Sequence, residues 1–298
     1  MNRLSFSNLF LMGTLSLVMG IAKAQQAPSK SPKIKTIVID AGHGGTDQGT
    51  KGTYSTEAQI TLQLALKLDT VLRNEMPDIR FVMTRTTDIY HNPKEKANIA
   101  NRETGDLFLC IHVNAAPPKK EVTGYKTVAT YKKVKGKKKK IYKKVPIYRY
   151  SPNPVYGTST YVWAADRSDE KTKGIIEDER YESSAEVMEV PDVNSPEALI
   201  KARLWSQKFF KNSVRLASMI EDEFIGNGRK SWGVLQRNHM GIWVLQATNM
   251  PAVLVETGFI TNKEEEDYLN SEAGQKEIVR SIANAVIKYK QMIDGKPQ

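Results

Sequence analysis

Cysteine is almost absent from this sequence, in which Cys110 is the only one among 298 residues. A disulfide within the chain is therefore impossible. Cys110 stands between Leu109 and Ile111 in an apolar run, which predicts a buried and inert thiol. A nucleophilic thiol that works with His112 is the alternative, because residues two apart on a strand share a face.

Long apolar runs are scarce as well, and the stretch from Leu9 to Ala22 is too short and too interrupted for a membrane span. Arg3 precedes this stretch, and Ala22-Lys23-Ala24 closes it with small-x-small spacing. The pattern predicts a secretory signal peptide over residues 1–24, with an uncleaved anchor as the alternative. We expect export across the inner membrane to the periplasm or cell envelope, and no stable membrane span after signal cleavage.

Acidic residues are outnumbered, since 33 aspartates and glutamates face 44 lysines and arginines. The full sequence has a net charge of +11, and removal of Arg3 and Lys23 with the signal peptide changes it to +9. An exported, basic protein suits an anionic polymer such as a cell wall better than nucleic acid. We therefore expect no nucleic-acid partner.

Much of the positive charge lies in one segment, with twelve lysines between Lys119 and Lys144. Alternating, β-forming stretches on both sides of Gly136 predict a β-hairpin inserted over residues 117–156 and tipped by Lys137 to Lys140. One interpretation is a solvated, charged hairpin. The other is attachment to an anionic wall or outer-envelope surface. Lysines interleaved with aromatic residues also occur in nucleic-acid binding, but the export signal argues against that use.

Three apolar stretches each end in a residue that can bind a metal or transfer a proton. Each is typical of a buried strand. They are Ile37-Val38-Ile39 before a glycine-rich turn with His43, residues 106–111 before His112, and residues 250–255 before Glu256.

A fourth chemically useful residue, Glu57, begins a helix for which Thr56 and Gln59 form a predicted capping box. Open α/β folds place their sites at the carboxyl ends of strands, so these four side chains are expected to converge. The spacing alone indicates metal-assisted hydrolysis of an amide or an ester.

The motifs also resemble a known family. In order along the chain they are IDAGHGG, the helix start at Glu57, MTR at Met83 to Arg85, IHVNA and PAVLVETGFITN. Together they resemble the zinc-dependent N-acetylmuramoyl-L-alanine amidases of the amidase-3 type, in particular the subgroup used in cell separation. The similarity covers residues 34–116 and 206–290, and Ala41 stands where the family usually has proline.

The resemblance implies a single α/β catalytic domain over residues 34–293, with a central mixed, mostly parallel sheet flanked by helices. Residues 25–33 are then a short N-terminal linker and residues 294–298 a tail. The domain carries two inserts, the basic hairpin and an acidic segment over residues 166–196.

The site residues follow from the same resemblance. One Zn²⁺ per chain is expected on His43, Glu57 and His112, with a position left for water. Glu256 is then the general base, although a fourth ligand or a buried ion-pair partner is an alternative. No HExxH helix is present. His239 is a further, less favoured ligand, and Arg85 and Asn114 are candidates for contacting substrate or for supporting the site.

The acidic segment suggests regulation. In related amidases of cell separation an insert at this position places a glutamate on the zinc. Glu170 is the candidate for that autoinhibitory ligand here, with Glu177 or Glu179 as alternatives and a solvated acidic loop as the simpler interpretation. A protein activator that displaces the insert is then a possible partner.

The implied substrate is peptidoglycan, cleaved at the amide between N-acetylmuramic acid and L-alanine during wall remodelling or daughter-cell separation. Two other functions stay open. One is a wall-binding module on an inactive amidase frame, and the other is a zinc peptidase that cuts within the stem peptide.

Overall fold

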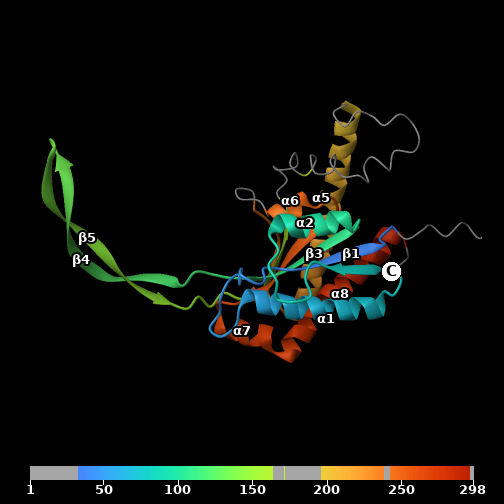
Figure 1. The fold of residues 1–298 in the computed structure, drawn as a ribbon. Helices are drawn as coiled ribbons and strands as arrows, with labels where there is room; N and C mark the ends of the chain where they lie inside the picture. Colours follow the sequence, from blue (N-terminus) through green and yellow to red (C-terminus); the bar gives the residue numbers. More distant parts are fainter. Residues whose placement is uncertain (1–32, 164–170, 172–195, 238–241, 296–298) are drawn as a thin grey trace, which may run out of the picture. The chain divides into compact units, whose positions relative to one another are not determined.

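A six-stranded sheet with helices on both faces forms the body of the protein in the computed structural model, which describes residues 33–163, 171, 196–237 and 242–295 (Figure 1). The strand order is β2-β1-β3-β8-β6-β7. The strands are β1 (Thr36–Ala41), β2 (Arg80–Met83), β3 (Leu107–Asn114), β6 (Thr158–Val162), β7 (Ser231–Gln236) and β8 (Ala252–Phe259).

The first four strands in this order are parallel to one another, with β8 between β3 and β6. Strand β6 runs antiparallel to β8, and β7 runs parallel to β6. The predicted mixed, mostly parallel sheet is therefore confirmed.

Two hydrophobic layers hold the helices against the sheet. Helices α1 and α8 cover one face, and α2 and α6 cover the other (Figure 1). In β3, Leu107, Leu109 and Ile111 belong to the first layer, while Phe108 and Cys110 belong to the second. A central strand buried on both faces needs an uninterrupted apolar run, which is why this sequence does not alternate. The helices are α1 (Glu57–Glu75), α2 (Pro93–Arg102), α5 (Pro196–Gly226), α6 (Trp243–Ala247), α7 (Lys263–Asn270) and α8 (Glu272–Asp294).

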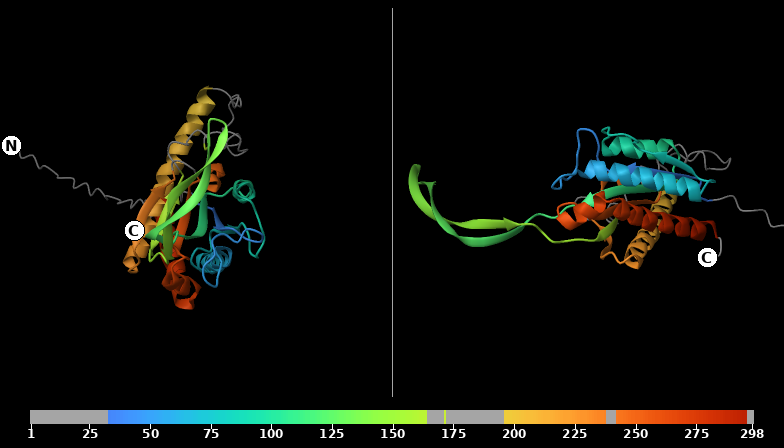
Figure 2. Two further views of the ribbon diagram at one scale, coloured as in Figure 1. Left: turned by 90° about the vertical axis from the view of Figure 1, so that its left-hand side faces the viewer. Right: turned by 90° about the horizontal axis from the view of Figure 1, so that it is seen from below.

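The lysine-rich segment forms a two-stranded antiparallel sheet of its own from β4 (Lys119–Val134) and β5 (Lys137–Ser151). Figure 2 shows the pair as a long, twisted ribbon. The turn consists of Lys135 and Gly136, with φ of 49° and 78°. Positive φ at both central residues is the mark of a tight hairpin turn, and Gly136 supplies it without strain. Lys137 to Lys140 therefore begin β5, next to the turn rather than in it.

A glutamate from the C-terminal half of the chain shapes the loop that leads into α1. The carboxylate of Glu266, in α7, accepts hydrogen bonds from the backbone N–H groups of Thr53, Tyr54 and Ser55 at 2.7, 2.9 and 2.9 Å. The hydroxyl of Ser55 donates a fourth bond at 2.8 Å. Burial by itself raises the pKa of Glu266, but these bonds outweigh it and lower the pKa to about 2. Two residues later the capping box of Thr56 and Gln59 starts the helix at Glu57, as predicted.

Several predicted features lie outside the described residues. They include the signal peptide over residues 1–24, His239, and the acidic insert with Glu170, Glu177 and Glu179, apart from Lys171 and Pro196. In the part of the chain that the structure describes, no helix is long and apolar enough to cross a membrane. The domain boundaries remain predictions.

Replacement of Glu266 by glutamine tests the role of this carboxylate. We expect Glu266→Gln to lower the free energy of unfolding by about 2 kcal/mol, because an amide group offers one acceptor oxygen where the loop needs two. The folded-state pKa lies below the ordinary value, so the stabilisation is present above pH 4.5 and is lost as the pH falls toward about 2. Urea unfolding of both proteins across that range measures the difference.

The matched control is Glu264→Gln, which removes the same charge from an exposed position in the same turn of α7. This control should unfold like the wild type. Equal effects of the two substitutions, or a difference that does not change with pH, would contradict the role assigned to Glu266.

Candidate metal centre

His43 lies in the turn that follows β1, and this turn passes very close to β3. His43 itself has φ of 57°. A Cβ atom on the preceding Gly42 would lie 2.6 Å from Nε2 of His112 and 2.8 Å from the carbonyl oxygen of Ile111, so a side chain does not fit there. The N–H of Gly42 donates to that same carbonyl at 2.9 Å. The glycines of this turn thus let one histidine approach the other.

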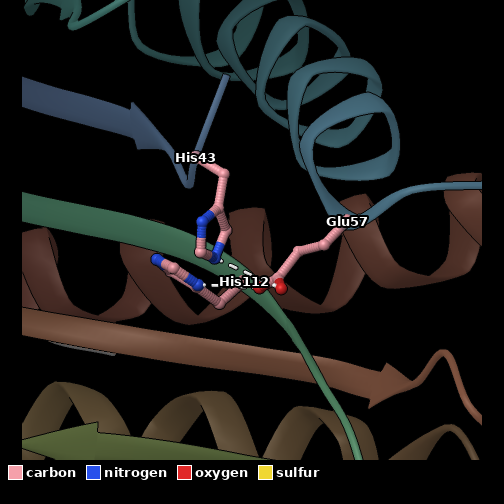
Figure 3. A group of neighbouring side chains, drawn as sticks. All are labelled: His43, Glu57 and His112. Atoms are coloured by element: carbon pink, nitrogen blue, oxygen red, sulfur yellow. Dashed lines mark hydrogen bonds and ion pairs between the residues drawn. The ribbon is translucent and has the colours of Figure 1, made fainter. Parts of the chain in front are cut away.

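Glu57 joins the two histidines. Its Oε1 lies 2.8 Å from Nδ1 of His112, and its Oε2 lies 3.2 Å from Nε2 of His43 (Figure 3). The backbone N–H groups of Val113 and Thr50 donate to the same two oxygens at 3.1 and 2.9 Å, which fixes the orientation of the carboxylate. The side chain is only 4% exposed.

Glu57 and the two histidines stabilise each other's charged forms. Burial would raise the pKa of Glu57, but the hydrogen bonds and charges of His112 and His43 hold it well below its usual value. Burial would lower the pKa of His43, but its contacts with Glu57 and Asp47 raise it to about 8. A carboxylate that stays ionised beside two imidazoles is a suitable partner for a cation.

The three side chains fit a single metal ion. One ligand atom from each of His43, Glu57 and His112 lies within 4.8 Å of the others, and they form the metal-ligand cluster found among the described residues. Two imidazole nitrogens and one carboxylate oxygen match a catalytic zinc site. The second ring nitrogen of His43, Nδ1, lies 2.8 Å from Oδ2 of Asp47, an outer contact that metal-binding histidines usually make. Asp47 was not foreseen from the sequence.

Glu256 lies beside this cluster. In the sheet it is the register partner of His112 on the neighbouring strand β8. The residue is 6% exposed, and its Oε2 is buried without a hydrogen-bond partner. Burial, together with the charge of Glu57, outweighs the charges of His112 and Arg237 and raises the pKa of Glu256 to about 7. A buried carboxylate with a raised pKa and one oxygen free of hydrogen bonds is a common feature of a catalytic acid or base.

Arg237 is a second residue that sequence reasoning missed. It follows β7, and its Nη2 lies 4.0 Å from Oε1 of Glu256. The guanidinium group also lies over the ring of Tyr161, 4.9 Å from its centroid. No local pattern marks this arginine, since β7 reaches the site only through its pairing with β6.

Arg85 and Asn114, the two candidates for contacting substrate, both form hydrogen bonds with backbone groups near the site. Arg85 is 2% exposed, and it donates to the carbonyl oxygens of Ala41, Gly42 and Ala58 at 3.0, 2.8 and 2.8 Å. It thereby ties the His43 turn to the first turn of α1. Asn114 accepts from the N–H of Ala115 at 2.8 Å through its side chain, at the end of β3.

Cys110 is buried, and the structure confirms that part of the prediction. Its thiol donates to Oδ2 of Asp40 at 2.9 Å, and burial with the nearby Asp40 charge raises its pKa well above the usual value. A thiolate is therefore disfavoured, which contradicts the alternative of a nucleophilic cysteine.

The same Asp40 pairs with the buried Lys96 at 2.9 Å, and Lys96 also donates to the carbonyl of Ala41 beneath the His43 turn.

The fold and the cluster together define an α/β protein with a candidate mononuclear metal centre at the carboxyl edge of its sheet. Residues 37–288 match the family Amidase_3, described as N-acetylmuramoyl-L-alanine amidase, and the chain belongs to this family.

Curated relatives are similar over most of the chain. The N-acetylmuramoyl-L-alanine amidase AmiA of Escherichia coli K12 is 27% identical over 277 residues, which are 89% of this chain and 80% of the relative. The probable amidase AmiB of Haemophilus influenzae is 27% identical over 262 residues, 85% of this chain but 52% of the relative. A sporulation-specific amidase of Bacillus subtilis is 44% identical over 79 residues, 26% of this chain and 31% of the relative. The chain thus spans about half or less of two of these proteins.

Solved structures share the fold. The crystal structure of an N-acetylmuramoyl-L-alanine amidase from Clostridium difficile 630 superposes with a TM-score of 0.55 at 24% identity, covering 86% of this chain and 97% of that one. The amidase AmiC2 of Nostoc punctiforme superposes with a TM-score of 0.54 at 20% identity, covering 86% and 97%.

Gly49 offers a direct test of the cluster. It has φ of 61°, and a Cβ there would lie 2.6 Å from Oε2 of Glu57 and 2.7 Å from Cδ2 of His43. We expect Gly49→Ala to weaken binding of a divalent metal by about 10–100-fold, because it displaces two of the three donors. Metal content after dialysis against graded chelator concentrations measures this affinity.

Gly136→Ala is the matched control, since Gly136 also has positive φ, 78°, but nothing lies within 4 Å of a Cβ there. It should retain metal like the wild type. A Gly49→Ala protein that is folded and binds metal unchanged would contradict the proposed donor set.

Proposed function

We propose that the protein is a zinc-dependent amidase that hydrolyses the bond between N-acetylmuramic acid and L-alanine in peptidoglycan. The observation that carries this proposal is the convergence of His43, Glu57, His112 and Glu256, which come from distant parts of the chain, at one sheet edge. Membership of the amidase family supplies the choice of substrate.

His43, Glu57 and His112 would hold the zinc ion. When bound, zinc lowers the pKa of a water molecule toward about 7 and polarises a carbonyl group. Glu256, whose Oε2 has no hydrogen-bond partner, would act as the general base that accepts a proton from the attacking water, and it would return that proton to the leaving nitrogen of the substrate. In the metal-free protein, burial raises the pKa of this carboxylate to about 7. A group that acts in both halves of the transfer must be ionised to accept the proton and protonated to donate it.

The residues around these four hold them in place. Asp47 binds the outer ring nitrogen of His43, and Arg85 fixes the carbonyl groups of the turn that carries it. Lys96 and Asp40 support the same turn from below. Arg237 lies at the exposed side of Glu256 and offers a cation to an anionic part of the substrate.

We further propose that the protein acts outside the cytoplasm, in wall remodelling or daughter-cell separation, with the acidic segment around Glu170 as a regulatory plug. The support is the apolar N-terminal stretch of the sequence and the resemblance to amidases of cell separation. A protein activator fits the same scheme. A solved structure of similar fold, at 20% identity and a TM-score of 0.54, is the CwlD amidase of Clostridioides difficile in complex with the GerS lipoprotein.

Digestion of purified sacculi tests the reaction. We expect the protein to release intact stem peptides with a free L-alanine amino group, and we expect a chelator to abolish the release and added zinc to restore it. Mass measurement of the products identifies the bond that is cut. Fragments cleaved within the stem peptide would show that the protein is a peptidase and not an amidase. Binding to sacculi without any release, even after deletion of residues 166–196, would favour a wall-binding module.

Glu256 can be separated from the metal ligands by substitution. We expect Glu256→Ala to keep its metal and to lose about 10²–10⁴-fold in turnover, the usual effect of removing a general acid or base. Glu57→Ala serves as the comparison, because it should lose metal and turnover together. Rate measurements on soluble muropeptides, with metal analysis of the same samples, distinguish the two variants. Undiminished turnover of Glu256→Ala would show that Glu256 is not the general base.

A further inference from the structure

The hairpin of β4 and β5 carries the excess positive charge of the whole protein. Twelve lysines and Arg149 against Glu121 give residues 119–151 a formal charge of +12, whereas the complete chain carries +11. The remainder is therefore nearly neutral. A binding partner attracted by charge would meet the protein at this hairpin.

The charge is concentrated toward the turn, in a segment that we call the hairpin tip (residues 132–140). Seven of its nine residues are lysines, and all nine are exposed. Near the base, by contrast, Glu121 forms an ion pair with Arg149. Within the described chain, the tip lysines form no ion pair with a carboxylate. The tip thus presents its positive charge without internal neutralisation.

The register makes this charge unfavourable for the hairpin alone. Lys132 lies directly opposite Lys139, and Lys133 lies opposite Lys138. Like charges at directly opposed positions destabilise a β-ribbon. An anionic surface that binds the tip removes this repulsion, so charge complementarity favours such a partner.

Aromatic and aliphatic side chains accompany the tip lysines. Tyr131 is the register partner of Lys140, and Tyr142 follows two residues later on the same face. These rings are 65% and 67% exposed. Val134 and Ile141 occupy the opposite face together with further lysines. Tyrosine with an apolar ring and a polar hydroxyl is enriched where a membrane meets water.

The position of the charge indicates the shape of the partner. A polymer that binds along the whole hairpin would favour lysines spaced evenly over both strands. A flat surface contacts only the end of the hairpin at its turn. Charge gathered at the tip therefore favours a surface. The lysine ammonium group is a compact point charge that binds phosphate without a fixed geometry, as lipid head groups require.

We propose that the hairpin tip docks the protein on an anionic lipid surface. The lysines bind phosphate head groups, and Tyr131 and Tyr142 lie in the interfacial layer. Fifteen paired residues span about 50 Å, and β4 begins five residues after the end of β3, where the metal centre lies. The docked hairpin is thus long enough to let the site act on material that is not itself at the lipid surface.

Vesicle co-sedimentation of the purified full chain tests the proposal. The vesicles contain phosphatidylcholine alone or phosphatidylcholine with phosphatidylglycerol. The tip variant combines Lys137→Gln, Lys138→Gln, Lys139→Gln and Lys140→Gln. The control combines Lys35→Gln, Lys94→Gln, Lys211→Gln and Lys276→Gln, which removes the same charge from exposed positions elsewhere. The apolar stretch from Leu9 to Ala22 is common to all three proteins, and binding to neutral vesicles measures its contribution.

The wild type and the control should bind anionic vesicles, with an affinity that falls as salt is added. The tip variant should bind about tenfold more weakly or worse, given the contribution of each lysine near an anionic surface. Equal binding by the tip variant and the control, or no preference for phosphatidylglycerol, would overturn the proposal. So would tip-dependent binding to purified sacculi without binding to anionic vesicles, which assigns the tip to the wall polymer instead.

Hydrolysis of soluble muropeptides, measured on the same proteins, distinguishes a failure of the docking proposal from a failure of the amidase proposal. The tip variant should match the wild type in that assay and in thermal unfolding, since no tip residue lies in the metal centre. A variant that binds vesicles normally but lacks turnover would bear on the amidase alone.

Discussion

The ionised carboxylate of Glu57, with an imidazole at each oxygen, is the interaction on which the candidate metal centre depends. It joins three separate parts of the chain, because its oxygens also accept from the backbone of β3 and of the loop before α1. A buried charge is tolerated only when its surroundings supply compensating charge and hydrogen bonds. The first turn of α1 is therefore fixed relative to the sheet by electrostatics as much as by packing.

Other buried carboxylates extend the same principle around the sheet edge. Glu266 accepts four hydrogen bonds from the loop that precedes Glu57. Glu265 pairs with Arg229 and accepts from the backbone of Gly157 and Phe259. Glu221 accepts from the hydroxyl groups of Thr158, Thr160 and Ser231. Each carboxylate connects segments that are irregular or end at this edge, so the position of the site relies on charged groups that take no part in its chemistry.

The sequence was sufficient to predict the central strands, the start of α1 and the gathering of His43, Glu57, His112 and Glu256. Short apolar runs and a capping box are local signals, and the rule that sites lie at strand ends supplied the convergence of the four side chains. It was not sufficient for Lys96, Arg237 or Glu266, since their roles arise from contacts between segments distant in the sequence. Asp47 lies only four residues from His43, but its contact with the ring depends on the conformation of the glycine-rich turn between them. Strand β7 was also missed: every residue from 231 to 236 is at least partly exposed, and Gly233 interrupts the short apolar pattern. Only the pairing with β6 makes this segment a strand.

The location of β8 has a consequence for how the protein matures. This strand follows β1, α1 and β3 along the chain, yet it lies in the interior of the sheet between β3 and β6 and carries Glu256. A nascent chain that stops short of residue 252 contains His43, Glu57 and His112 but has neither a completed sheet nor Glu256. The proposed hydrolysis therefore has to wait until β8 has been made and inserted into the sheet, a safeguard that follows from strand order alone.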